Sequence, residues 1–197
     1  MNKKMMPLFV LPLLMLTSCG NEYDLPGKKV DATKAQEVID SYSQEEVDAL
    51  ELDNGDLTTS YSILKIDKSL SDLMKLKAGD DLIPTTSQKG VMPPIVYQIE
   101  GTLTGAEGIE YYLDDDILSV AFVPTEETLE GLDINAGYSE MGVTMSDVAL
   151  TISLNEYGLL DDLSVYYTMD FDNVNLLGTN VDGSIRIHTD MDVSWDL

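Results

Sequence analysis

Cysteine is almost absent from this 197-residue chain, which contains a single one, Cys19. One cysteine cannot form a disulfide within the chain, so no covalent cross-link adds to the stability of the fold. A metal site built from several thiolates is excluded for the same reason. The folded state must therefore depend on the burial of apolar side chains.

Basic residues are also scarce, with 11 lysines and arginines against 36 aspartates and glutamates, which gives a net charge of −25 at pH 7. Binding of nucleic acid depends on lysine and arginine that neutralise phosphates, so we expect no nucleic-acid partner. Anionic lipid headgroups repel such a chain as well. We therefore expect its folded part to stand away from any membrane to which it is attached.

The N-terminal residues have the composition of a secretory signal. Lys3 and Lys4 form a short basic start, residues 5–16 are almost entirely apolar, and the small residues Thr17 and Ser18 follow. This order of charge, apolar run and small residues is typical of a segment that directs export and is then removed. The apolar run is too short to span a bilayer.

Leu16-Thr17-Ser18-Cys19 resembles the lipobox of bacterial lipoproteins. The resemblance implies that a diacylglyceryl group is attached to the sulfur of Cys19, that fatty acids such as palmitate anchor the chain, and that cleavage occurs just before Cys19. We expect a signal peptide at 1–18, a lipidated tether at 19–30 and one globular domain at 31–197. An ordinary signal peptide that happens to contain a cysteine is the alternative. A lipidated Cys19 would leave no thiol for catalysis.

Helix signals follow the tether. Thr33 and Gln36 fit a capping box, and apolar residues recur at helical spacing up to Tyr42, so we predict a helix over 34–43. Ser43 begins a second candidate helix that would run to residues 54–55, although 47–52 could also form a strand. Residues 61–66 are predicted to be extended, and a short helix is predicted to start at Ser69 and to end before Gly79.

Residues 78–94 contain three prolines and two glycines and show little periodicity. They are predicted to form a long loop. Long loops in compact domains are often lids or binding segments and are otherwise disordered. Both interpretations stay open at this point.

Alternation of apolar and polar residues dominates the rest of the chain and predicts strands over 95–103, 118–122, 148–154 and 163–171. The C-terminal stretch is the clearest case, because seven apolar residues take odd positions: Val181, Ile185, Ile187, Met191, Val193, Trp195 and Leu197. Polar residues take the even positions. One apolar and one polar face are typical of an antiparallel sheet.

His188 and Arg186 are the only histidine and the only arginine, and both lie on the polar face of the last predicted strand. Asp190 lies on the same face, so His188 could take part in a Ser-His-Asp arrangement. The chain has no nucleophile elbow, however, and a regular strand face is a poor place for a cleft. We interpret these residues as parts of a solvated face and predict no catalytic residues.

Acidic clusters at 53–56, 114–116, 161–162 and 170–173 supply the oxygen ligands that Ca²⁺ prefers. None of them matches an EF-hand loop, and we interpret them as solvated turns. With 36 acidic residues, two neighbouring carboxylates are expected by chance and do not indicate glycoside hydrolysis. We therefore predict neither a metal site nor a cofactor, and weak Ca²⁺ binding at these acidic turns is the alternative.

These patterns together predict an α+β fold, in which an N-terminal helix or helices precede a long antiparallel meander. The order of elements and the lipobox give the chain a weak resemblance to the LolA/LppX-like lipoproteins. That resemblance implies a curved half-barrel sheet whose apolar concave side holds lipid, with residues 78–94 as a lid.

Two function classes follow. The first is a membrane-anchored extracytoplasmic lipoprotein that acts as a non-catalytic binding or envelope interaction module, with another envelope protein as partner. The second is a carrier or sensor of a lipid or other apolar ligand. A filled core would favour the interaction module, and an open apolar groove would favour the carrier.

Overall fold

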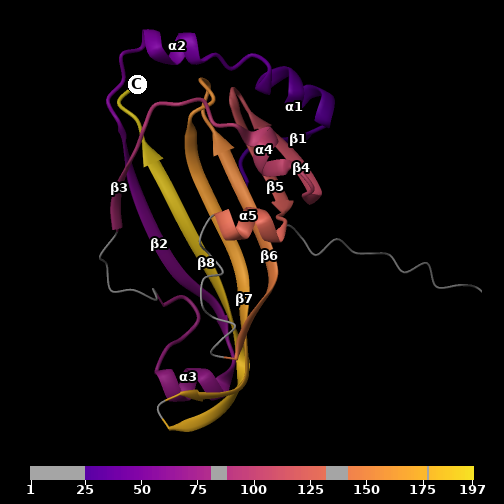
Figure 1. The fold of residues 1–197 in the computed structure, drawn as a ribbon, viewed down its shortest axis with the longest axis vertical. Helices are drawn as coiled ribbons and strands as arrows, with labels where there is room; N and C mark the ends of the chain where they lie inside the picture. The colour runs from indigo at the N-terminus through magenta and orange to yellow at the C-terminus, as the bar shows by residue number, and fades with distance from the viewer. Residues whose placement is uncertain (1–24, 81–87, 132–141, 177) are drawn as a thin grey trace, which may run out of the picture.

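The computed structural model describes residues 25–80, 88–131, 142–176 and 178–197. The predicted signal peptide, Cys19 and most of the tether lie outside these residues. The elements alternate along the chain, and the helices are short (Figure 1). Their order is β1 (Lys28–Val30), α1 (Ala32–Ile39), α2 (Gln44–Ala49), β2 (Gly55–Ile66), α3 (Lys68–Met74), β3 (Gln88–Met92), α4 (Ile99–Leu103), β4 (Glu107–Asp114), β5 (Ile117–Val123), α5 (Glu126–Gly131), β6 (Val143–Leu154), β7 (Leu160–Leu176) and β8 (Thr179–Ser194).

All eight described strands belong to one open antiparallel sheet, in the order β1-β4-β5-β6-β7-β8-β2-β3. The predicted α+β class and antiparallel sheet are confirmed at this level. The predicted order is wrong, because β1 comes before α1, and α3, α4 and α5 lie between strands. Strands β4 to β8 are neighbours in space as they are in sequence, which makes this part a meander. β2 pairs with β8, and β3 pairs with β2. Two strands from the first half of the chain therefore extend the sheet beyond its last strand in sequence.

The hairpin β7–β8 forms the middle of the sheet and contains its longest strands, of 17 and 16 residues (Figure 1). Leu163 pairs with Met191 and Met169 with Ile185, as the alternation of apolar residues requires. The inward side chains of β7 and β8 are mostly buried, but Leu197, which was predicted to point inward, is 64% exposed because β8 ends at Ser194.

Two clusters of buried apolar residues cover one face of the sheet. The larger joins β5, β6 and β7 to Ala35 of α1, Ile99 of α4 and Leu129 of α5. The smaller packs Leu70 of α3 against residues of β2 and β8 such as Ile63 and Ile187. Helix α3 lies near the lower end of the sheet in Figure 1. We call the side of the sheet that carries these clusters the inner face and the opposite side the outer face.

The early helices lie near their predicted positions but begin elsewhere. Helix α1 starts at Ala32 and not at Lys34, because Asp31 acts as N-cap and its side chain accepts a hydrogen bond of 2.9 Å from the amide of Lys34. α2 begins after Ser43 and is only six residues long. α3 ends where Lys75 adopts a left-handed conformation, well before Gly79.

Two predictions for the middle of the chain are wrong. Residues 95–103 do not form a strand, because their second half is helix α4, in which Ile99 is buried and Leu103 packs against the same core one turn later. The predicted loop at 78–94 contains strand β3, whose residues pair with β2, for example Val91 with Asp56. Residues 81–87 of that loop lie outside the described residues.

The end of the predicted tether belongs to the sheet, since Lys28–Val30 pair with β4 as strand β1. Just before this strand, Gly27 has a φ of +90°, and a Cβ atom there would lie 2.4 Å from the carbonyl oxygen of Leu113. Only glycine fits such a close approach of two backbones in this conformation. The chain therefore turns at Gly27 directly against the end of β4.

Candidate functional site

Polar residues of β6, β7 and β8 line up across the outer face. Ser153 pairs with Asp162, which in turn pairs with Asp192. The next row contains Thr151, Ser164 and Asp190, and the row after it contains Tyr166 and His188. Directly paired residues of an antiparallel sheet point to the same side, so the register alone brings these groups together.

These residues line a pocket of about 350 Å³ on the outer face, which we call the outer-face pocket. Leu25 and Pro26, which precede β1, also line it. Thr151, Ser153 and Ser164 are buried although they are polar. The pocket therefore differs from the solvated face that we predicted, because its floor is closed to water.

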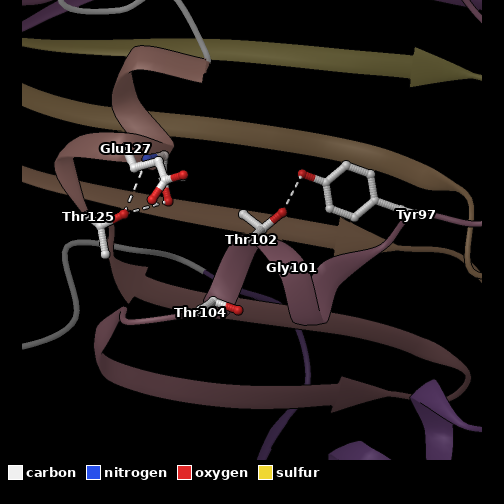
Figure 2. A pocket seen from close by; sticks show the side chains of 7 residues that line it. Tyr97, Gly101, Thr102, Thr104, Thr125 and Glu127 are labelled. Atoms are coloured by element: carbon white, nitrogen blue, oxygen red, sulfur yellow. Dashed lines mark hydrogen bonds between the residues drawn. The ribbon is translucent and has the colours of Figure 1, made fainter.

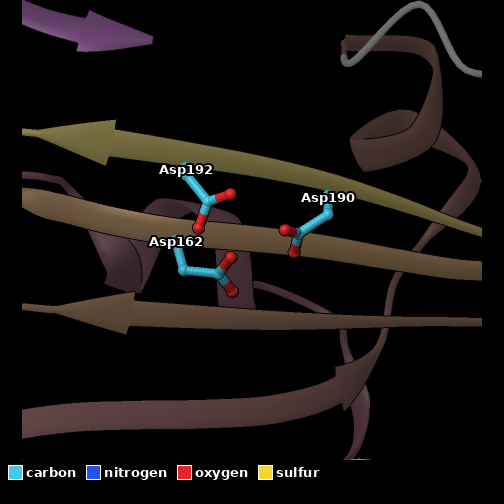
Figure 3. Close-up of side chains that lie close together, drawn as sticks. All are labelled: Asp162, Asp190 and Asp192. Carbon is cyan, nitrogen blue, oxygen red and sulfur yellow. The ribbon is translucent and has the colours of Figure 1, made fainter. Parts of the chain in front are cut away.

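The carboxylates of Asp162, Asp190 and Asp192 form the most densely charged part of the pocket. Their ligand oxygens all lie within 4.8 Å of one another, and Figure 3 shows the three groups pointing toward each other from β7 and β8. The hydroxyl of Ser164 donates to Oδ1 of Asp190 at 2.6 Å and lies 3.3 Å from Oδ1 of Asp162. We call these three aspartates the acidic cluster.

The acidic cluster keeps a proton at neutral pH. Burial, the hydrogen bond to Asp190 and the charges of Asp190 and Asp192 together raise the pKa of Asp162 to about 8. Burial also raises the pKa of Asp192. Burial opposes ionisation of Asp190 too. Hydrogen bonds with Ser164 and with the neighbouring carboxyl groups outweigh this effect and lower the pKa of Asp190. Three carboxylates so close together cannot all ionise at neutral pH, and Asp162 holds the proton.

His188 lies beside this cluster and stacks on Tyr166, with ring centroids 4.3 Å apart and planes at 10°. Its Nε2 is 3.7 Å from Oδ1 of Asp190 and has no hydrogen-bond partner within the described part of the chain. Burial lowers the pKa of His188, although the charge of Asp190 opposes this effect. His188 is therefore neutral at pH 7 and acts as an aromatic wall of the outer-face pocket.

The Ser-His-Asp arrangement considered for His188 and Asp190 is not assembled in this pocket. The hydroxyl of Ser164 donates to carboxylates and not to the imidazole, so His188 does not take the position of the base of such a triad. Arg186 donates instead to the hydroxyl of Thr168 and the backbone carbonyl of Asp147. These contacts tie β6, β7 and β8 together.

The acidic cluster is the one group of three potential metal-ligating side chains found among the described residues. Three carboxylate oxygens are a chemically suitable set for a hard cation. A proton held by Asp162 competes with a cation for the same oxygens, however. We assign no metal to the acidic cluster.

A second pocket, of about 450 Å³, lies between α4 and α5 and is lined largely by threonines (Figure 2). The hydroxyls of Tyr97 and Thr102 lie 3.2 Å apart, and Thr125 accepts from the amide of Thr128 at the start of α5. These hydroxyl groups already bond to one another. We therefore interpret this pocket as a gap between the end of α4 and the start of α5.

Sequence reasoning missed the acidic cluster because it placed Asp162 in an acidic turn and Asp190 and Asp192 on a separate solvated face. The signal that would have joined them is the turn of the β7–β8 hairpin at Gly178, which has a φ of +84°. Counting outward from this turn, with one β-bulge, pairs Asp162 with Asp192. The bulge between Phe171 and Val174 is the part that the sequence does not reveal.

No helix in the described part of the chain is long and apolar enough to cross a membrane. Comparisons with protein-family models, with curated proteins and with solved structures find no match to this chain. The lipobox at Leu16–Cys19 and the resemblance to LolA/LppX-like lipoproteins therefore stay predictions from the sequence.

Proposed function

We propose that this chain is a lipid-anchored, extracytoplasmic bacterial lipoprotein that acts as a non-catalytic binding or interaction module of the cell envelope. Its anchor is a diacylglyceryl group on Cys19, at the end of the lipobox. Its partner is another envelope protein. The observation that carries the proposal is the dense packing of the inner face.

Within the described part of the chain, side chains of the sheet and of the covering helices pack together on the inner face. Leu150, Ile152 and Val165 are 0% exposed, and Ala35 and Ile99 from the covering helices belong to the same cluster. A carrier of an apolar ligand needs a concave apolar surface that its own residues leave open. The two pockets described above are instead lined mainly by hydroxyl and carboxylate groups. This packing supports the interaction module over the carrier.

The unequal cover of the two sheet faces supports the same proposal. The buried residues of α1, α3, α4 and α5 belong to the inner-face clusters. The outer face carries stacked rings, hydroxyls and carboxylates in rows fixed by strand pairing. Groups held on rigid strands contact a partner with little loss of conformational freedom, which favours recognition.

The anchor is tested by the change Cys19→Ala. The parent should incorporate labelled palmitate and sediment with membranes, because two or more acyl chains give stable attachment. The variant should take up no label and should appear in the soluble fraction or as an uncleaved precursor. Labelled palmitate in the variant would contradict lipidation at Cys19.

The choice between module and carrier is tested by native mass spectrometry of the Cys19→Ala chain and by one substitution, Val165→Phe. The module predicts protein free of lipid adducts, and it predicts that Val165→Phe overpacks the core and costs about 1–3 kcal/mol. The matched control is Val91→Phe, at a position that is 65% exposed. The alternative, a lipid carrier in a half-barrel, predicts bound lipid, and it predicts that Val165→Phe lowers the uptake of a fluorescent fatty acid without loss of stability.

A further inference from the structure

Residues Leu25–Gly27, which we call the strap, belong to the predicted tether and directly precede strand β1. Leu25 and Pro26 line the outer-face pocket together with the acidic cluster. The strap is held at its other end by the turn at Gly27 against Leu113. One short segment thus connects the anchored end of the chain with three crowded carboxyl groups.

The groups around the acidic cluster offer little compensation for negative charge. β6 contributes Ser153 and Thr151 to the pocket, and the strap contributes only apolar side chains. On β2, the residues paired with Asp192 and Asp190 are Thr58 and Ser60. The ionisable neighbours are Tyr166 and His188, which stack on each other. Lys29 of β1 forms an ion pair with Glu110, in which Nζ and Oε1 are 2.7 Å apart.

An apolar strap can lie over carboxyl groups as long as they are not all ionised. A neutral carboxyl group that is hydrogen-bonded to its neighbour tolerates a dry cover, whereas a carboxylate requires water or a counter-charge. Leu25 and Pro26 line one side of the pocket, so seating of the strap reduces the contact of the carboxyl groups with water and favours the protonated state of the cluster. By the reciprocity of linked equilibria, full ionisation of the cluster must disfavour seating to the same extent.

We propose that the strap is a pH-dependent latch, which rests on the outer face while the acidic cluster holds a proton and leaves that face when the cluster ionises completely. The pKa of about 8 for Asp162 places the change slightly above neutral pH. The latch does not depend on lipidation or on the proposed interaction partner.

The test uses a spin label next to the strap. Since Cys19 is the only cysteine, the full chain with Cys19→Ala and Asp24→Cys carries one thiol for a nitroxide, and its mobility is followed by electron paramagnetic resonance in detergent micelles from pH 5 to pH 9. We expect a restricted label at low pH and a mobile label above the transition. Asp162→Asn should abolish the transition and keep the label restricted. Asp72→Asn, which removes an exposed charge on α3, should leave the transition unchanged.

Two results would overturn the latch: a label whose mobility is the same from pH 5 to pH 9, or a transition that persists unchanged in Asp162→Asn. A second measurement serves if Asp162→Asn does not fold. Carboxyl ¹³C titration of the chain with Leu25→Gly and Pro26→Gly should show the pKa of Asp162 lowered by about one unit relative to the parent, because the strap no longer excludes water. An unchanged titration of Asp162 in that variant would equally refute the proposal.

Discussion

Replacement of the protonated carboxyl of Asp162 should make the protein more stable at high pH. Asp162 has a folded-state pKa of about 8 against an ordinary value of 3.8, so the folded chain binds more protons than the unfolded chain between these two values. Stability is therefore lost as the pH rises from about 4 to about 8. Asp162→Asn keeps the size of the side chain and removes the charge that causes this loss.

The expected size of the effect follows from the pKa and the surroundings of Asp162. For a fully desolvated group, a pKa raised from 3.8 to about 8 corresponds to roughly 5–6 kcal/mol. Asp162 is only partly buried and lines a pocket, so water screens its interactions. We reduce the figure accordingly to about 2 kcal/mol. For a domain of this size, that is an increase in Tm of about 4–8 °C.

The assay compares melting curves of the parent and Asp162→Asn, recorded by circular dichroism at several pH values from 4 to 9. The advantage of the variant should be near its minimum at pH 4 and should reach its full size above pH 8. Asp72→Asn controls for the loss of one negative charge in an acidic chain. If the difference between parent and variant does not change with pH, or if the parent is the more stable at pH 9, the protonated state of the acidic cluster is refuted.

Three further predictions concern the fold. Ile152→Ala, at a position with 0% exposure, should lower the free energy of unfolding in urea by about 2–5 kcal/mol, whereas Val91→Ala on the exposed edge should change it by less than about 0.5 kcal/mol. Gly158→Ala should lower Tm, because Gly158 has a φ of +76° and a Cβ atom there would lie 2.5 Å from the ring of Tyr42. Gly101→Ala in α4 should raise Tm, because a Cβ atom there meets open space and alanine favours a helix over glycine. Removal of β8 should abolish cooperative melting, because it separates β7 from β2; a retained transition would contradict the topology.

The sheet could be predicted from sequence where one face is apolar and the other polar. β5, β7 and β8 follow this pattern, and their inward residues, such as Val120 and Val165, are buried. Periodicity failed at residues 95–103, because Ile99 and Leu103 are four apart and satisfy both a strand and a single turn of helix. A segment of five residues is too short for its period to decide between them.

Pairing between distant segments could not be predicted. β2 lies beside β8, more than a hundred residues later, and local patterns do not specify which strand a given edge accepts. The acidic cluster could not be predicted for the same reason, because it depends on the register of β7 against β8 and on one β-bulge. The raised pKa of Asp162 also depends on the burial of this carboxyl group, on a face that looks solvated in the sequence.

The two edges of the sheet are formed by its shortest strands, β1 with three residues and β3 with five. Long exposed edges offer unpaired amide and carbonyl groups on which further chains can add, and this is a common route to fibrils. Here the long strands β7 and β8 lie in the interior, Pro93 and Pro94 follow β3, and Lys28 and Lys29 occupy β1. Proline and lysine at an edge oppose strand addition. Many copies of this protein can therefore be held at high local density without polymerising through the edge strands of their sheets.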